Sequence, residues 1–166
     1  MSPGDHPVRR VRLGLAAAAL IVAAAGSAGC AGVVPRSLEL VVEDVTHGRV
    51  LLREPVRPGD TFVLSYVHSS EHVPVRGVFR IEADHSFTVI ETAFGGFGPG
   101  LPALKPGDDW EVREGMIVAR EPGVRLPDLT VRVLPITRHR LSTPGGRSLD
   151  LTATVVEGGA VEIRVR

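Results

Sequence analysis

The sequence lacks most of the features that would fix a small domain by covalent or metal links. Its 166 residues include one cysteine, Cys30, so the chain that follows cannot use a disulfide framework, a thiolate nucleophile or a cysteine-type zinc site. An excess of charge is also missing. Residues 30–166 carry sixteen basic and eighteen acidic side chains, which argues against nucleic acid as a partner. We therefore expect an ordinary hydrophobic core, for which this length suffices.

The first 29 residues form a separate region and predict export from the cytoplasm. Three arginines lie within residues 9–12, an uninterrupted apolar run covers residues 13–25, and small residues fill positions 26–29 before Cys30. Positive charge, an apolar stretch of this length and small residues in this order are typical of a secretory signal. We predict a signal or anchor over 1–29, a linker over 30–36 and an extracytoplasmic location for the rest.

Three fates remain open for this segment. Signal peptidase would cut after Ala28 and release the domain, whereas lipoprotein processing would cut before Cys30 and lipidate its thiol. The segment could also stay uncut as a membrane anchor, since residues 13–35 carry no charge. We predict lipidation of Cys30, although Ser27 stands where such a signal usually has leucine.

Residues 37–166 predict one all-β domain. The apolar residues there repeat with a period of two, and glycine and proline separate short runs rich in valine, leucine, isoleucine and threonine. This pattern indicates a small antiparallel β-sandwich or partly open barrel of about eight or nine strands. The last two strands are expected to pair as a hairpin across 157–159. The predicted strands cover residues 37–43, 49–53, 61–69, 75–82, 87–94, 116–120, 129–134, 148–156 and 160–165.

The densest polar cluster follows the strand that starts at Thr61. His68 and His72 with Glu71 could ligate zinc, but Pro74 prevents the helix that would bring two histidines together. Ser69 or Ser70 could act as a nucleophile with His68 or His139, yet no Gly-x-Ser-x-Gly elbow frames either serine. A structural histidine and a ligand- or partner-binding histidine are the other two interpretations. We predict no catalytic residue, no metal and no cofactor.

A glycine-rich loop over residues 95–102 is the second candidate feature. It lacks the Gly-Lys-Ser/Thr ending of a phosphate-binding loop, and no helix follows it. If the strands from Thr61, Val75 and Phe87 form a meander, this loop lies at the same end of the sheet as residues 68–71. We therefore predict one composite ligand- or partner-binding surface formed by His68, Ser69, Glu71, Gly98, Gly100 and Leu101. His139 is a further candidate for ligand or partner binding.

These segments resemble a known bacterial family. Residues 66–71 match an aromatic-x-His-Ser-x-Glu segment, and residues 97–102 match a later glycine loop, with Phe79 between them and the stretch 138–141 as a weaker third match. Together they resemble the domain-of-unknown-function family numbered 1850, over about residues 38–166. Residues 75–77 depart from the acidic or aromatic residues common there. The resemblance implies a membrane-attached extracytoplasmic protein, encoded beside TAXI-type TRAP transporters that take up organic acids.

The leading interpretation is a non-enzymatic accessory protein at the outer face of the cytoplasmic membrane. The resemblance implies a transporter permease or a solute-binding protein as its partner, and the N-terminal segment provides the contact with the membrane. The second interpretation is a β-domain that binds a small ligand or a metal by itself, and the third is a hydrolase. An adjacent permease gene, bound metal in the purified protein, and a buried Ser-His-acid triad would separate the three.

Overall fold

A computed structural model of the chain describes residues 38–120 and 123–166. The chain divides into two units, 1–34 and 35–166, and the described residues all belong to the second. The predictions for the signal segment and for Cys30 lie outside the described residues. Among the described residues, no helix is long and apolar enough to cross a membrane.

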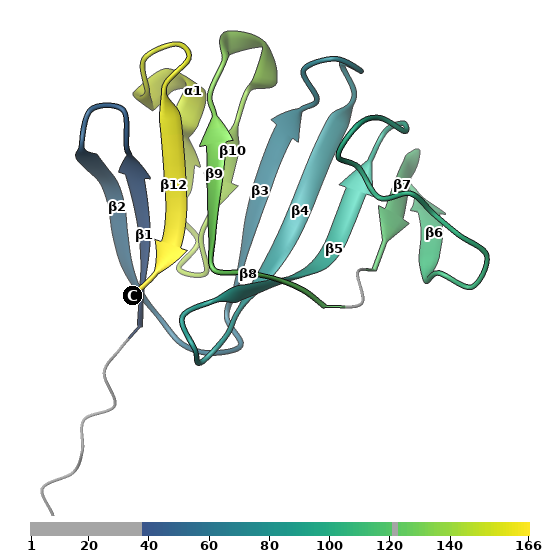
Figure 1. The fold of residues 1–166 in the computed structure, drawn as a ribbon, viewed down its shortest axis with the longest axis horizontal. Coiled ribbons are helices and arrows are strands. Elements are labelled where there is room, and N and C mark those ends of the chain that lie inside the picture. The colour runs from purple at the N-terminus through teal and green to yellow at the C-terminus, as the bar shows by residue number, and fades with distance from the viewer. Residues whose placement is uncertain (1–37, 121–122) are drawn as a thin grey trace, which may run out of the picture. The chain divides into compact units, whose positions relative to one another are not determined.

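The described residues form twelve antiparallel strands in two sheets (Figure 1). A four-stranded sheet has the order β2-β1-β12-β9, and we call it sheet A. An eight-stranded sheet has the order β11-β10-β3-β4-β5-β7-β6, with β8 also paired to β5, and we call it sheet B. The strands are β1 (Leu38–Asp44), β2 (Arg49–Val56), β3 (Thr61–Val67), β4 (Pro74–Ile81), β5 (Phe87–Phe94), β6 (Trp110–Arg113), β7 (Met116–Ala119), β8 (Val124–Leu126), β9 (Asp128–Arg132), β10 (Arg140–Ser142), β11 (Ser148–Asp150) and β12 (Ala160–Val165).

One hydrophobic core joins the two sheets and makes the domain a β-sandwich. Leu40 and Ile163 from sheet A and Phe62 from sheet B belong to the same buried cluster. The ring of Phe62 stacks on Phe79 at 4.9 Å between centroids, and Phe87 meets both rings edge-on. Period-two alternation places these residues on the inner faces, as expected for strands with one face towards a core.

The all-β prediction is confirmed, and most strands start within two residues of their predicted positions. The strand predicted over 148–156 is wrong beyond Asp150. The carboxylate of Asp150 accepts a hydrogen bond from the N–H of Ala153 at 3.0 Å and so begins a short helix, α1 (Leu151–Thr154). The helix turns Leu151 into the core.

The predicted hairpin between the last two strands is therefore also wrong. β12 lies between β1 and β9, and β11 pairs with β10 instead. None of the predicted strands corresponds to β6, β8 or β10, which are only three or four residues long. A one-turn 3₁₀ helix, η1 (Pro135–Thr137), connects β9 to β10.

Sheet B extends beyond the last strand of sheet A. β9 is the edge of sheet A, whereas sheet B continues through β4, β5, β7 and β6. In Figure 1, β3 and β4 are visible beside β9 rather than covered by another strand of sheet A, and β8 crosses near their lower ends. Residues 100–102 lie against the inner face of this part of sheet B, β8 pairs with β5, and the candidate site lies between them.

Candidate functional site

His68 lies in the turn between β3 and β4 and its main chain closes that turn. Its N–H donates to the carbonyl of Val73 at 2.8 Å, and its carbonyl accepts from the N–H of His72 at 2.9 Å. His72 has a φ of 57°, in the left-handed region that non-glycine residues rarely adopt. The turn is therefore tightly folded, and it leaves the half-buried His68 ring beside the glycine-rich loop.

The imidazole of His68 connects the β3–β4 turn to the glycine-rich loop. The N–H of Glu71 donates to Nδ1 at 3.3 Å, so Nδ1 is the acceptor nitrogen. Nε2 consequently carries the proton and donates to the carbonyl of Pro99 at 2.9 Å. The hydroxyl of Ser70 lies 3.2 Å from Nδ1 and 3.2 Å from a carboxylate oxygen of Glu71. We call this set of contacts the His68 latch.

The loop that meets the latch is a tight turn over residues 98–101. The N–H of Leu101 donates to the carbonyl of Gly98 at 3.2 Å, and Gly100 has a φ of 79°. Proline at the second position and glycine with positive φ at the third are typical of a type II turn. Gly98 is needed for a different reason, because a Cβ there would lie 2.5 Å from Cγ of Glu71.

The structure thus brings together most residues of the predicted composite surface. His68 and Glu71 contact the turn formed by Gly98, Gly100 and Leu101. Ser69 is exposed, and its neighbour Ser70 makes the side-chain contact with the histidine. Binding by this surface stays a prediction.

His139 lies elsewhere, buried against β3. Its ring stacks on Tyr66 with 5.2 Å between centroids and an interplanar angle of 20°. The hydroxyl of Thr137 donates to the carbonyl of Leu134 at 2.7 Å, so it accepts from Nδ1–H of His139 at 2.8 Å. Burial lowers the pKa of His139 and raises that of Tyr66, so both side chains are held in their neutral forms.

A groove of about 340 Å³ lies on the inner face of sheet B beside β9. Its floor comes from β3, β4 and β5, one wall from residues 100–102, and the other wall from β8 and β9. Among the residues that the structure describes, no charged side chain lines it. The lining residues are Leu64, Tyr66, Val75, Gly77, Phe79, Val89, Thr92, Gly100, Leu101, Pro102, Val124, Leu126 and Leu129. The predicted composite surface includes Gly100 and Leu101 of one wall but no residue of the floor, although period two places Tyr66 on the same face as His68.

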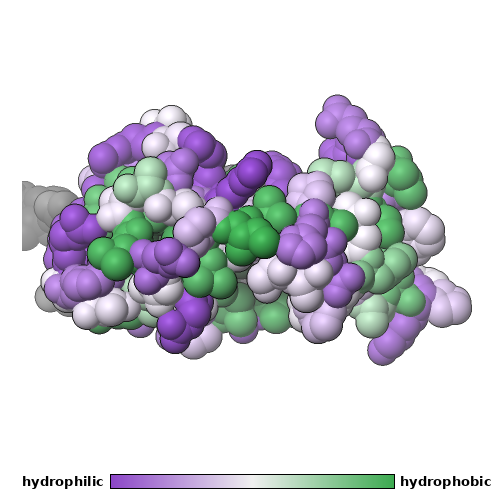
Figure 2. All heavy atoms as spheres, turned by 90° about the horizontal axis from the view of Figure 1, so that it is seen from above, coloured by the Kyte–Doolittle hydropathy of each residue, from purple (hydrophilic) through white to green (hydrophobic). Residues whose placement is uncertain are grey.

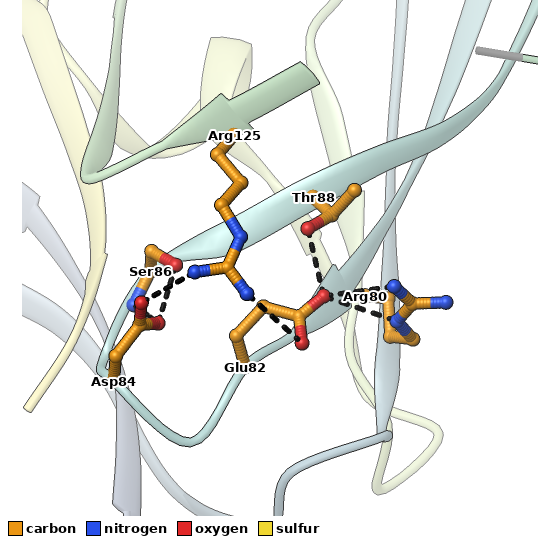
Figure 3. Close-up of polar contacts among 6 residues, drawn as sticks. All are labelled: Arg80, Glu82, Asp84, Ser86, Thr88 and Arg125. Carbon is orange, nitrogen blue, oxygen red and sulfur yellow. Dashed lines mark hydrogen bonds and ion pairs between the residues drawn. The ribbon is translucent and has the colours of Figure 1, made fainter. Parts of the chain in front are cut away.

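A polar network fixes the β8 wall to the β4–β5 hairpin (Figure 3). Arg125 of β8 donates to Asp84 at 2.6 Å and lies 3.9 Å from Glu82. Glu82 in turn accepts from Thr88 at 2.7 Å and from Arg80 at 3.0 and 3.1 Å. The hydrogen bond from Thr88, and to a lesser extent those from Arg80, lower the pKa of Glu82 below its usual value. The carboxylates are therefore ionised at neutral pH and hold the arginine of β8 in place.

Large hydrophobic side chains are exposed around this part of sheet B. Phe97, Trp110 and Val112 have exposed fractions of 60%, 47% and 66%. Phe97 packs edge-on against the buried Phe94, at 5.7 Å between ring centroids. Figure 2 looks onto the end that carries the β3–β4 turn and shows green hydrophobic areas separated by purple hydrophilic ones. This end of the domain is therefore mixed in polarity rather than uniformly charged.

The metal and nucleophile alternatives can be compared with this geometry. Across residues 38–120 and 123–166, no three or more His, Cys, Asp and Glu side chains are placed to hold a metal ion, so His68, Glu71 and His72 do not form such a group. Both nitrogens of His68 already have partners. Ser70 lies near Nδ1, but a carbonyl rather than a carboxylate faces Nε2. The hydrogen-bond order of a Ser-His-acid triad is therefore not present at His68.

The fold and the site together define a small antiparallel β-sandwich with an apolar groove on the part of its larger sheet beyond β9. The chain belongs to the family described as Domain of unknown function (DUF1850), which matches residues 62–151, more than half of the sequence. This confirms the resemblance noted in the sequence. The comparisons with curated proteins and with solved structures each found no match. The matched region includes the latch, the groove and His139.

Proposed function

We propose that this protein is a non-enzymatic accessory protein, attached to the outer face of the cytoplasmic membrane, that binds a component of a TAXI-type TRAP transporter. The observation that carries the proposal is the groove, since an accessory protein needs a surface for its partner. Its lining is apolar, and exposed aromatic and aliphatic side chains lie nearby. Apolar surface of this kind is typical of interaction sites.

The location of the protein outside the cytoplasm and its attachment to the membrane are part of the same proposal. The arginines of residues 9–12, the apolar run over 13–25 and Cys30 support export and membrane attachment. A lipid on Cys30 would hold the domain near a membrane permease. Radioactive or alkyne-labelled fatty acid supplied to growing cells should label the native protein and not Cys30→Ser.

The transporter contact can be tested by purifying the native full chain from membranes in a mild detergent. We expect a permease or a solute-binding subunit to co-purify with it. Thr92→Trp fills the groove floor and should remove that subunit. Ser65→Trp, on the opposite face of the same sheet, is the matched control and should retain it. Equal recovery with both variants, or no transporter subunit with the native chain, would refute the proposal.

A second candidate function is the binding of a small apolar molecule. The groove volume of about 340 Å³ lies at the lower end of the range of small-molecule sites. Native mass spectrometry of the protein purified from its own membranes would detect a retained molecule, and Thr92→Trp should release it.

A further inference from the structure

The free edge of β9 borders the groove and offers main-chain hydrogen-bonding groups. The N–H of Val133 donates to Gly159 on the β12 side, at 2.9 Å. Main-chain groups of successive residues point to opposite edges of a strand, so the odd-numbered residues of β9 pair with β12. The main-chain N–H and C=O groups of the even-numbered residues, Asp128, Thr130 and Arg132, point away from β12. Among the described residues, no strand other than β12 pairs with β9.

A strand added at this edge would lie over the groove. Leu129 of β9 forms part of the groove wall, and β3, β4 and β5 form the floor below. A strand added to β9 would lie about 4.8 Å from it and about 10 Å above sheet B, the usual spacings in sandwiches. Every second side chain of that strand would enter the groove.

The other described edge strands are less suited to accept a strand. β2 carries Pro55, whose missing N–H limits edge pairing. β6, β8 and β11, which each pair with a single strand of sheet B, have four, three and three residues. β9 is the edge strand that combines five residues with an apolar groove beside it.

A second copy of the chain does not fit at this edge. Antiparallel pairing of two β9 strands requires a two-fold axis perpendicular to sheet A. Sheet B extends past β9 on one side of sheet A (Figure 1), so the two copies would place their eight-stranded sheets in the same layer. The space beside β9 therefore suits one slender segment.

The charges on β9 specify what such a segment carries. None of the ion pairs among the described residues includes Asp128. Arg132 donates to the carbonyl of Gly158 at 2.8 Å rather than to a carboxylate. Residues directly opposite in a ladder lie on the same face, where opposite charges stabilise pairing. An antiparallel partner would place an acidic residue opposite Arg132 and a basic residue opposite Asp128.

We propose that β9 accepts an extended segment of a partner protein as an added antiparallel strand, with acidic, apolar, polar, apolar and basic residues in that order. Its apolar side chains fill the groove, and its main chain pairs with the free edge of β9. This proposal rests on the proposed function, because it takes the groove as the partner-binding face, and it adds how the partner binds. It does not require that the partner be a transporter.

The test uses the full chain in detergent micelles and a fluorescein-labelled peptide, Glu-Val-Thr-Val-Arg, read by fluorescence anisotropy. We expect saturable binding, since main-chain pairing gives affinity in strand addition. Thr130→Pro removes an N–H that faces away from β12, at the free edge of β9, and should weaken binding about tenfold, whereas Thr130→Ala should bind within about twofold of the native chain. No saturable binding, or equal binding by the two variants, would overturn the proposal.

Two peptide controls keep the test decisive if Thr130→Pro does not fold. N-methylation of the central threonine of the peptide blocks its bond to Thr130 and should abolish binding, whereas N-methylation of the second valine, whose N–H points away from β9, should not. The reversed peptide, Arg-Val-Thr-Val-Glu, should bind more weakly. Equal affinity of the two N-methylated peptides, or of the two charge orders, would overturn strand addition with this partner chemistry. Because purified components are used, the outcome is independent of whether a transporter co-purifies.

Discussion

Replacing His68 tests whether the latch holds the groove wall. His68→Ala removes the hydrogen bond to Pro99 at 2.9 Å and the one from the N–H of Glu71 at 3.3 Å. Each bond contributes about 0.5–1.5 kcal/mol net, and the freed groups lie near water, so we expect a loss of about 1–2 kcal/mol. For a domain of this size that corresponds to a fall in Tm of roughly 4–8 °C.

Two conservative variants separate the bonds made by His68. His68→Asn places an oxygen near the position of Nδ1 and should keep the β3–β4 turn while releasing Pro99. His68→Gln places a donor near the position of Nε2 and should keep Pro99 while loosening the turn. Hydrogen exchange at the amide of Leu101, which bonds within the 98–101 turn, reports on the loop.

We expect that exchange to accelerate in His68→Ala and His68→Asn and to change little in His68→Gln. Unchanged exchange and unchanged Tm in His68→Ala would show that the hydrogen bonds of the latch contribute nothing to the stability of the loop or of the domain, and would refute this prediction.

Three further perturbations probe the packing and the charges around the site. Gly98→Ala would place a methyl 2.5 Å from Cγ of Glu71 and should cost about 1 kcal/mol by chemical denaturation, with recovery in a Glu71→Ala background; no recovery would contradict that clash. Phe79→Ala, which empties a site stacked on Phe62, should cost about 3–5 kcal/mol in the same assay, and a cost below that of Gly98→Ala would contradict its central place in the core. Because burial lowers the pKa of His139, the unfolded state binds the proton more readily: this contribution to stability is complete above about pH 6.5 and is lost as pH falls below it. Tm measured from pH 7.5 to 5 should fall less steeply in His139→Asn, and parallel curves would refute this assignment.

The sequence predicted those parts of the fold that depend on local pattern. β5 and β12 have their predicted bounds, because period-two alternation and flanking turn residues identify strands of this length. β8 and β10 are too short for periodicity to appear. β11 ends at Asp150 because the side chain of this residue caps the start of α1. The alternation of apolar and polar residues continues past Asp150 and therefore did not reveal this capping role.

The candidate site divides in the same way. Proximity of residues 68–71 to the 95–102 loop followed from the meander β3-β4-β5, because consecutive antiparallel strands return alternate connections to the same end. The groove could not be predicted, because its second wall comes from β8 and β9. The position of β9 at the edge of sheet A depends on the non-local pairing of β12 with β1, which local sequence patterns do not reveal. The stacking of Tyr66 on His139 likewise depends on the non-local pairing of β10 with β3.

The floor and the walls of the groove are stabilised by different interactions, and this difference bears on how the groove can bind. The floor shares the aromatic packing of Phe62, Phe79 and Phe87 with the sandwich core. The loop wall is held by the His68 latch and a small apolar cluster that includes Leu101. The β8 wall is held by main-chain pairing with β5, by packing of Leu126 on the core and by the contacts of Arg125. Segments with few buried apolar contacts open at a lower free energy than a core. We therefore expect the loop wall to open at a lower free energy than the floor, against which the side chains of a bound segment would pack.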